Sequence, residues 1–173
     1  PIRDAGGAII GAVLVFRDVT ERRREELRQA FLLEATRLLA SSLDPEQTMM
    51  VVAQLAVPRV ADWCAVDVIG DGGRIRRVAV AHSDPSKVAL AHEIYHRYPP
   101  DPDSPHGVSK ILRTGEPELI PEIGDDLLRA LARDEEHLRI VRDLGIGSYM
   151  GVAIRGAGGV LGAVSFVSEG NRP

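Results

Sequence analysis

Residues 148–167 read SYMGVAIRGAGGVLGAVSFV and contain the clearest strand signals in the chain. Two runs rich in β-forming residues, Ser148 to Arg155 and Val160 to Val167, flank the glycine-rich tetrapeptide 156–159. Two such runs separated by a short loop that contains glycine are typical of a β-hairpin. The sequence therefore predicts two antiparallel strands here, followed by a loop over residues 168–173.

A second hairpin is predicted nearer the middle of the chain. The run Trp63 to Ile69 is rich in β-formers, and Asp71-Gly72-Gly73 is a turn signal before a second run, Arg74 to His82. Between the two hairpins, the sequence first predicts a helix at Ser86 to Tyr98 and an extended proline-rich loop at Pro99 to Pro105. A short helix at Gly107 to Thr114, closed by Gly115, and a short strand at Glu118 to Ile120 follow. The last predicted element is a charged helical segment at Asp125 to Leu144, in one or two pieces.

Two helices are predicted ahead of these hairpins. Thr20 is a good N-cap, and the strong helix formers after it predict a long helix that ends at about Leu43. Asp44 and Pro45 then begin a second helix that ends near Val60, because Asp is a favoured cap and Pro suits the first helical position.

The first residues predict a further hairpin over 2–19, turned at Asp4 to Gly7 and with its second strand at Ile9 to Phe16. A two-stranded hairpin is not stable alone, so we expect it to pair with sequence outside this chain or to be ragged. The order of elements predicts an α+β fold with a central antiparallel sheet flanked by helices. The length of 173 residues fits one full domain with an appendage.

Composition and charge exclude several classes of protein. The formal net charge of −4 argues against a nucleic-acid partner, which would need a basic face. The basic run Arg22 to Arg24 is followed by Glu25 and Glu26, as on a solvated helix surface. Cys64 is the single cysteine, so no disulfide can form within the chain and a reducing compartment, the cytoplasm, is predicted. No apolar run spans a bilayer, so no membrane contact is predicted.

The stretch His92-Glu93-Ile94-Tyr95-His96 matches the H-E-x-x-H pattern of zinc hydrolases. Two imidazoles four residues apart on a helix share a face and can bind zinc, while the glutamate acts as a base. Against this function, no third ligand follows at the usual spacing, and Pro99 ends the helix directly afterwards. We therefore predict no metal site and no catalytic residue, and keep the hydrolase as a remote alternative.

Residues 1–25 resemble the C-terminal end of a PAS domain. The segment 11–22 reads GAVLVFRDVTER, in which a last strand runs into an Asp-Val-Thr-Glu-Arg junction and then a helix. The resemblance assigns residues 1–20 to the last strands of a PAS domain and residues 21–43 to a connecting helix. It places the ligand site of that PAS domain outside this chain.

The larger part of the chain resembles the GAF domains of bacterial sensor proteins. The matching pieces are LLASSL at 38–43, ADWCAVD at 61–67, YPPDP at 98–102, RTGEP at 113–117 and GVLGAV at 159–164. The resemblance implies an antiparallel sheet covered by helices on one face and by short helices and loops that close a small pocket on the other. It assigns residues 44–173 to a GAF domain whose final helix is expected after residue 173.

This resemblance implies a non-catalytic sensory or regulatory module of a multidomain bacterial signalling protein. A sensor histidine kinase is the output that it predicts, and a serine/threonine phosphatase of the PP2C type is the alternative. A GAF domain that only dimerises and binds nothing is a third reading. The sequence names no cofactor.

A small-molecule ligand is expected between the sheet and the segment Tyr95 to Leu119. The proline-rich loop must run over the body of the domain, and the helix after it returns an apolar face as a lid. The residues predicted to contact a ligand are Tyr95, Tyr98, His106, Val108, Ile111, Leu112 and Tyr149. The alternative, that these side chains close a dry core, stays open.

The connecting helix predicts a homodimer. Its apolar residues Leu27, Phe31, Leu38 and Leu39 fall mostly three or four positions apart and form one stripe. In a helix that joins two sensory domains, such a stripe favours a parallel pairing with a second copy. Packing of the stripe on the domain's own sheet is the alternative.

Overall fold

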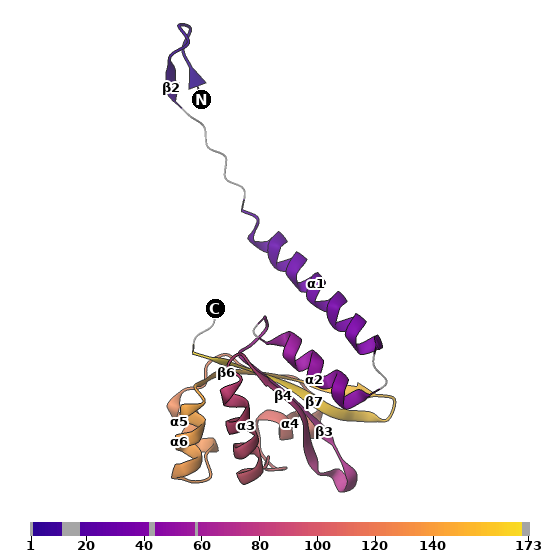
Figure 1. Cartoon of the computed structure of the whole chain (residues 1–173). Helices are drawn as coiled ribbons and strands as arrows, with labels where there is room; N and C mark the ends of the chain where they lie inside the picture. Colours follow the sequence, from indigo (N-terminus) through magenta and orange to yellow (C-terminus); the bar gives the residue numbers. More distant parts are fainter. Residues whose placement is uncertain (1, 12–17, 42–43, 58, 171–173) are drawn as a thin grey trace. The chain divides into compact units, whose positions relative to one another are not determined.

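The computed structural model describes residues 2–11, 18–41, 44–57 and 59–170 (Figure 1). The chain divides into two compact units, Pro1–Arg37 and Leu38–Pro173, which are described separately.

The first unit begins with a small antiparallel hairpin of β1 (Ile2–Arg3) and β2 (Ile9–Gly11). Asp4 closes the predicted turn, because its Oδ1 accepts hydrogen bonds from the backbone amides of Gly6 and Ala8. The rest of the predicted strand, residues 12–16, lies outside the described residues.

Helix α1 (Thr20–Ser41) is the predicted connecting helix. Thr20 is its first helical residue rather than its cap: the Thr20 amide donates to Asp18 Oδ1 and the Arg23 amide to Val19 O. The predicted end at Leu43 lies outside the described residues. Pairs one turn apart, such as Arg22 with Glu26, satisfy charges along the helix surface.

The second unit is built on a five-stranded antiparallel sheet in the order β4-β3-β7-β6-β5. The strands are β3 (Trp63–Ile69), β4 (Ile75–His82), β5 (Glu118–Ile120), β6 (Ile146–Gly156) and β7 (Gly159–Glu169), with a 3₁₀ turn at Asp71–Gly73 between the first two. The two predicted hairpins pair with each other through β3 and β7, which makes β7 the central strand. The predicted α+β class with an antiparallel sheet is confirmed.

Helix α2 (Pro45–Ala56) covers one face of this sheet (Figure 1). Asp44 caps it as predicted, accepting hydrogen bonds from the Glu46 and Gln47 amides. Ala53 and Ala56 of this helix are buried, and their small side chains allow close packing. Cys64 of β3 is also fully buried. Burial raises the pKa of the Cys64 thiol to about 12, so this cysteine is an apolar core residue and not a nucleophile.

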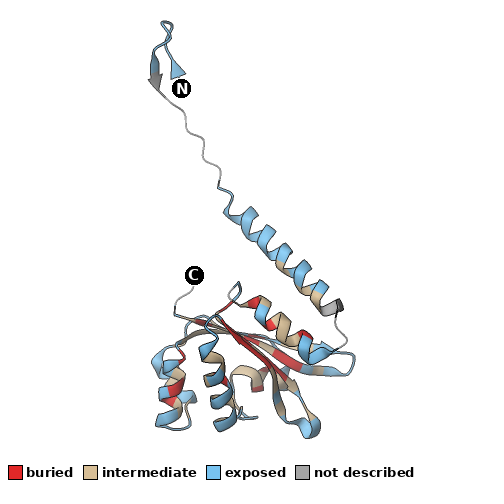
Figure 2. Ribbon diagram, viewed as in Figure 1, coloured by how far each residue is buried: buried red, intermediate tan, exposed pale blue. Residues whose placement is uncertain are grey.

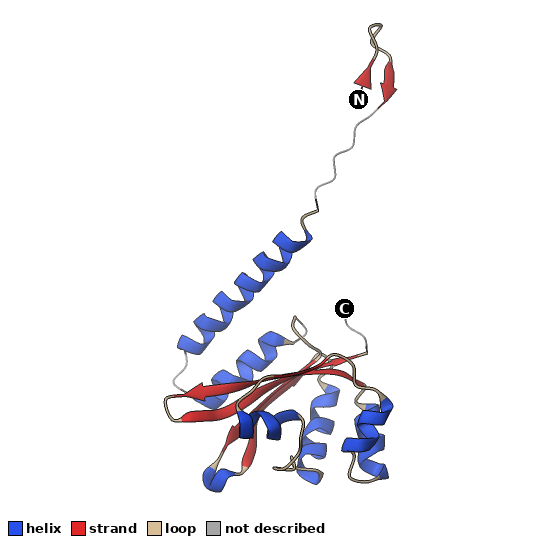
Figure 3. Cartoon of the chain, turned by 180° about the vertical axis from the view of Figure 1, so that it is seen from behind, coloured by secondary structure: helices blue, strands red, loops and turns tan. Residues whose placement is uncertain are grey.

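The other face of the sheet carries the remaining helices (Figure 3). They are α3 (Ser86–Arg97), α4 (Gly107–Thr114), α5 (Asp125–Leu131) and α6 (Glu135–Asp143). The buried residues follow the sheet between these two layers (Figure 2). Gly115 ends α4 as predicted, with a φ of 71° that only glycine adopts without strain.

Several predicted boundaries are corrected. Helix α2 ends at Ala56 and not near Val60, and α3 ends at Arg97. Residues 168–173 were expected to form a loop, but Ser168 and Glu169 extend β7 by pairing with the start of β6. None of the helices in the described ranges is both long enough and apolar enough to cross a bilayer.

Candidate functional site

The sheet face opposite α2 forms the floor of a cavity of about 510 Å³. Strand pairing sets this floor, because Trp63 lies opposite Val167 and Ala65 opposite Ser165 in the β3–β7 ladder. Tyr149 of β6 lies on the other side of Val167. Residues on neighbouring strands that stand opposite each other point to the same face, so these five side chains form one surface.

The walls of the cavity come from three segments. These are α3 with the proline-rich loop, the first turn of α4, and the stretch from the end of β5 through the α5–α6 pair. The apolar lining residues from these segments are Ala91, Ile94, Pro99, Pro100, Pro105, Val108, Ile120, Ile123, Leu128, Ala130, Leu131, Ala132, Val141 and Leu144. The volume falls within the roughly 300–1,000 Å³ typical of small-molecule sites. Apolar walls with a few polar groups are also typical of such sites.

The structure brings together five of the seven predicted ligand residues, since Tyr95, Tyr98, His106, Val108 and Tyr149 all line this cavity. Ile111 and Leu112 do not line it. Ile111 is fully buried on the inner side of α4, and a Cβ placed on Gly151 of the sheet would clash with its Cδ1. The proposal that Ile111 forms the apolar lid is therefore corrected: it is a core residue that holds α4 on the sheet.

Apart from Tyr149, sequence reasoning missed the lining residues that come from the sheet and from α5–α6. Trp63 and Ala65 alternate with buried Cys64 and Val66, so their common face could be read from the sequence. Which face the cavity occupies could not be read, because both faces of this sheet are covered by helices.

An ion pair stiffens the floor of the cavity. The fully buried carboxylate of Asp67 binds Arg77 through two parallel hydrogen bonds, Nε to Oδ1 at 3.0 Å and Nη2 to Oδ2 at 3.1 Å. The guanidinium also lies 4.4 Å from the centre of the Tyr95 ring, and Tyr95 Oη donates to the Ile75 carbonyl. This chain of contacts links β3, β4 and α3, and it fixes the tyrosine at the cavity wall.

Tyr149 contributes a neutral polar group to the floor. Its hydroxyl lies 3.0 Å from Ser165 Oγ. Burial raises the pKa of Tyr149 to about 12, so the phenol stays protonated at physiological pH. A side chain at Gly151 would displace this ring, since a Cβ there would lie 2.5 Å from Tyr149 Oη. The glycine therefore makes room for the tyrosine over the strand.

At the rim of the cavity, side-chain contacts join the proline-rich loop to α6 and to the residues just before it. The Tyr98 ring stacks on His137 with centroids 4.3 Å apart, and its hydroxyl donates to Asp134. Arg133 donates to the Pro99 carbonyl. Burial and then the Arg133 charge lower the pKa of His137, so this imidazole is neutral at physiological pH.

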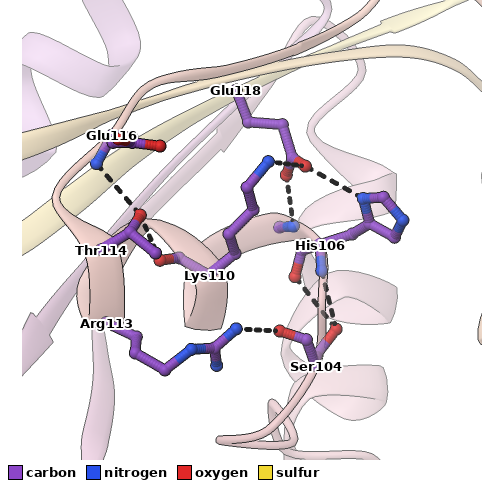
Figure 4. Close-up of polar contacts among 8 residues, drawn as sticks. Ser104, His106, Lys110, Arg113, Thr114, Glu116 and Glu118 are labelled. Atoms are coloured by element: carbon purple, nitrogen blue, oxygen red, sulfur yellow. Dashed lines mark hydrogen bonds and ion pairs between the residues drawn. The ribbon is translucent and has the colours of Figure 1, made fainter.

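The buried carboxylate of Glu118 anchors the start of α4 (Figure 4). It accepts hydrogen bonds from His106 Nδ1 at 3.0 Å, from the Gly107 amide at 2.6 Å and from Lys110 Nζ at 2.9 Å. Burial raises the pKa of Glu118, but the bonds from Lys110, His106 and Gly107 outweigh it and the net pKa is lowered. The anchor is therefore at full strength above the carboxyl group's ordinary pKa and weakens as the pH falls through the lowered value.

The H-E-x-x-H match lies on α3, where His92, Glu93 and His96 are all exposed. In the ranges that the structure describes, no three His, Cys, Asp or Glu side chains are grouped so as to bind a metal ion.

Comparisons with solved structures place the fold. The GAF domain of nlh2 from A. aeolicus in an inactive state shares 16% sequence identity with a TM-score of 0.54, over 81% of this chain and 78% of that one. The GAF domain of a phosphoenolpyruvate-protein phosphotransferase from Acinetobacter shares 12% identity with a TM-score of 0.56, over 84% and 79%. The corresponding domain from Coxiella burnetii shares 16% identity with a TM-score of 0.56, over 83% and 79%.

No curated protein matches the chain. The family model of the GAF domain matches residues 44–173, which is most of the chain and contains every residue of the cavity. GAF domains are sensory or regulatory modules and are generally not catalytic. By this match, and by a sheet and helix arrangement shared with solved GAF domains, the chain belongs to the GAF domain family.

Proposed function

We propose that residues 44–173 are a sensory domain that binds a small molecule in the cavity between the sheet and the α3–α6 layer. The observation that carries this proposal is the cavity itself, of about 510 Å³, with an apolar lining and the polar groups of Arg77, Tyr149 and Ser165 on its floor. These groups are held by the ion pair to Asp67 and by the Tyr149–Ser165 contact, so a ligand would meet a preorganised surface.

The walls supply a route from binding to regulation. The proline-rich loop is attached by a few polar contacts, including those from Arg113 to the Pro102 and Ser104 carbonyls and from Arg133 to the Pro99 carbonyl. A ligand that contacts both the rigid floor and this loop would favour one position of the loop over others. A ligand shifts such an equilibrium only by its different affinity for the two states.

A thermal-unfolding screen with small aromatic and heteroaromatic fragments tests this function. A fragment present at 100 times its dissociation constant should stabilise the folded chain by about 2.7 kcal/mol. For a chain of this size that corresponds to a rise in melting temperature of about 5–10 °C. If no fragment in a broad library raises the melting temperature, the small-molecule function is wrong.

For the parent protein we propose a multidomain bacterial signalling protein with a PAS domain ahead of this chain. The order of a short hairpin, a long helix and a GAF domain supports this arrangement. A histidine kinase is the proposed output, with a phosphatase of the PP2C type as the alternative. A cytoplasmic location is part of the same proposal.

We also propose that α1 pairs with the α1 of a second copy. Leu27 is 65% exposed, and acidic and basic side chains near it pair within the helix, so this member of the stripe is available to a partner. Changing Leu27 and Phe31 to Glu should convert a dimer to a monomer in sedimentation at micromolar concentration, because each Glu would place a charge in the helix pair. The control, Thr36→Glu on the opposite side of the helix, should stay dimeric. A wild-type chain that sediments as a monomer would rule out the pairing.

A further inference from the structure

Among the described residues, no group accepts a hydrogen bond from the indole N–H of Trp63. Its side chain is 7% exposed and lines the cavity. In the described part of the chain, its Nε1 is the one buried side-chain nitrogen or oxygen without a hydrogen bond partner. The indole N–H can only donate, and leaving such a donor unsatisfied in the interior costs about 1–3 kcal/mol. A group that enters the cavity with an acceptor would remove this cost.

The described side chains around Trp63 offer no hydrogen bond acceptor to its indole N–H. Val80, Ala91 and Leu144 form an apolar cluster with the indole, so they offer it no acceptor. The centroids of the His82 ring and the indole lie 4.0 Å apart with the ring planes at 75°, but both nitrogens of His82 are engaged. The Asp84 amide donates to His82 Nδ1, and Nε2 lies 3.0 Å from Glu169 Oε1.

The charges along the cavity indicate an uncharged ligand. The positive charge of Arg77 on the floor is already matched by Asp67. Asp101 and Arg133 also line the cavity, but they belong to the segments at its rim, where Arg133 donates to the Pro99 carbonyl. An ionised group brought to the apolar cluster around Trp63 would lose its hydration without gaining a counter-ion there, which is strongly unfavourable. A neutral acceptor such as a carbonyl oxygen or a pyridine-type nitrogen avoids this penalty.

We propose that the cavity takes an uncharged, mainly apolar molecule bearing a hydrogen bond acceptor, and that Trp63 Nε1 donates to that acceptor. This inference rests on the proposed function, since it specifies the ligand class of the same cavity. It assigns to Trp63 the role of a specificity-determining residue.

The test uses three probes of one shape: indan-1-one, which carries an acceptor, indane, which carries none, and indane-1-carboxylate, which is charged. Trp63 is the only tryptophan, so the chain gives a single indole N–H signal in ¹H–¹⁵N spectra. Indan-1-one should move this signal to lower field as the hydrogen bond forms, and indane should not. The carboxylate should bind more weakly than the ketone.

The variant Trp63→Phe removes the donor and keeps an aromatic ring. The ratio of the indane to the indan-1-one dissociation constant should fall about three- to tenfold in the variant, the usual range for one net hydrogen bond. Using the ratio cancels the different solubilities of the two probes in water. If Trp63→Phe does not fold, the indole signal of the unchanged chain decides the question.

The outcomes separate the two proposals. Both neutral probes could bind while indan-1-one leaves the indole signal in place and Trp63→Phe leaves the ratio of the two dissociation constants unchanged. The proposed role of Trp63 would then be wrong, and the binding function would stand. Tighter binding of the carboxylate than of the ketone also overturns the inference alone. If none of the three probes binds and the fragment screen yields no hit, both proposals fail.

Discussion

Replacing Arg77 with leucine is expected to lower the free energy of unfolding by about 3–5 kcal/mol. The reason is the position of its partner: the Asp67 carboxylate is fully buried, and Arg77 pairs with it through two hydrogen bonds. Removal of the guanidinium leaves a buried charge without compensation. Urea unfolding of the two proteins, followed by circular dichroism, measures the difference.

Arg76 provides the matched control on the same strand. It pairs with Glu46 at 2.7 Å, but both side chains are more than half exposed. Exposed pairs of this kind contribute about 0–1 kcal/mol, so Arg76→Leu should have a small effect. The double change Asp67→Leu with Arg77→Leu should recover much of the loss, because no charge is then buried. Equal effects of Arg77→Leu and Arg76→Leu would contradict the role of the pair in holding the cavity floor.

Ile111→Ala is expected to destabilise the domain by about 2–5 kcal/mol. Ile111 has no exposed surface and packs between α4 and the sheet near Gly151, so its truncation leaves a void that its neighbours fill only in part. Leu119→Ala is the control, since Leu119 is 68% exposed and surface changes alter stability by about 0.5 kcal/mol or less. Both values come from denaturant unfolding.

The Ile111 variant also separates a core residue from a ligand contact. Because Ile111 lies outside the cavity, fragments from the screen should bind Ile111→Ala with nearly unchanged affinity at a temperature where the variant is folded. A variant as stable as the wild type that has lost fragment binding would restore the lid role predicted from the sequence.

Local sequence signals predicted the elements of the second unit well. The glycine-rich turn before Val160, the Asp44-Pro45 helix start and the Gly115 stop each act within a few residues, and the structure has them as expected. The end of β7 was predicted less well, because Ser168 and Glu169 become a strand only by pairing with β6 some twenty residues earlier. Such pairing depends on the whole sheet and not on the two residues.

The candidate site was predicted in part for the same reason. Tyr95, Tyr98 and His106 lie on or beside the proline-rich loop, whose course over the domain follows from local chemistry. Trp63 and Arg77 reach the cavity through the register of the sheet. Ile111 was misplaced because the apolar residues of a short helix reveal that one side is buried but not which neighbour buries each residue.

Binding in this cavity is tested most directly by the affinity of the strongest fragment from the screen for wild type, Ala65→Leu and Ala157→Leu. Ala65 stands on the cavity floor, so leucine there would occupy space that a ligand needs, whereas Ala157 lies in the exposed turn between β6 and β7. If the ligand binds in this cavity, Ala65→Leu should lose affinity by about tenfold or more and Ala157→Leu should lose none. Unchanged affinity for Ala65→Leu, with the variant folded, would contradict the claim that this cavity is the binding site.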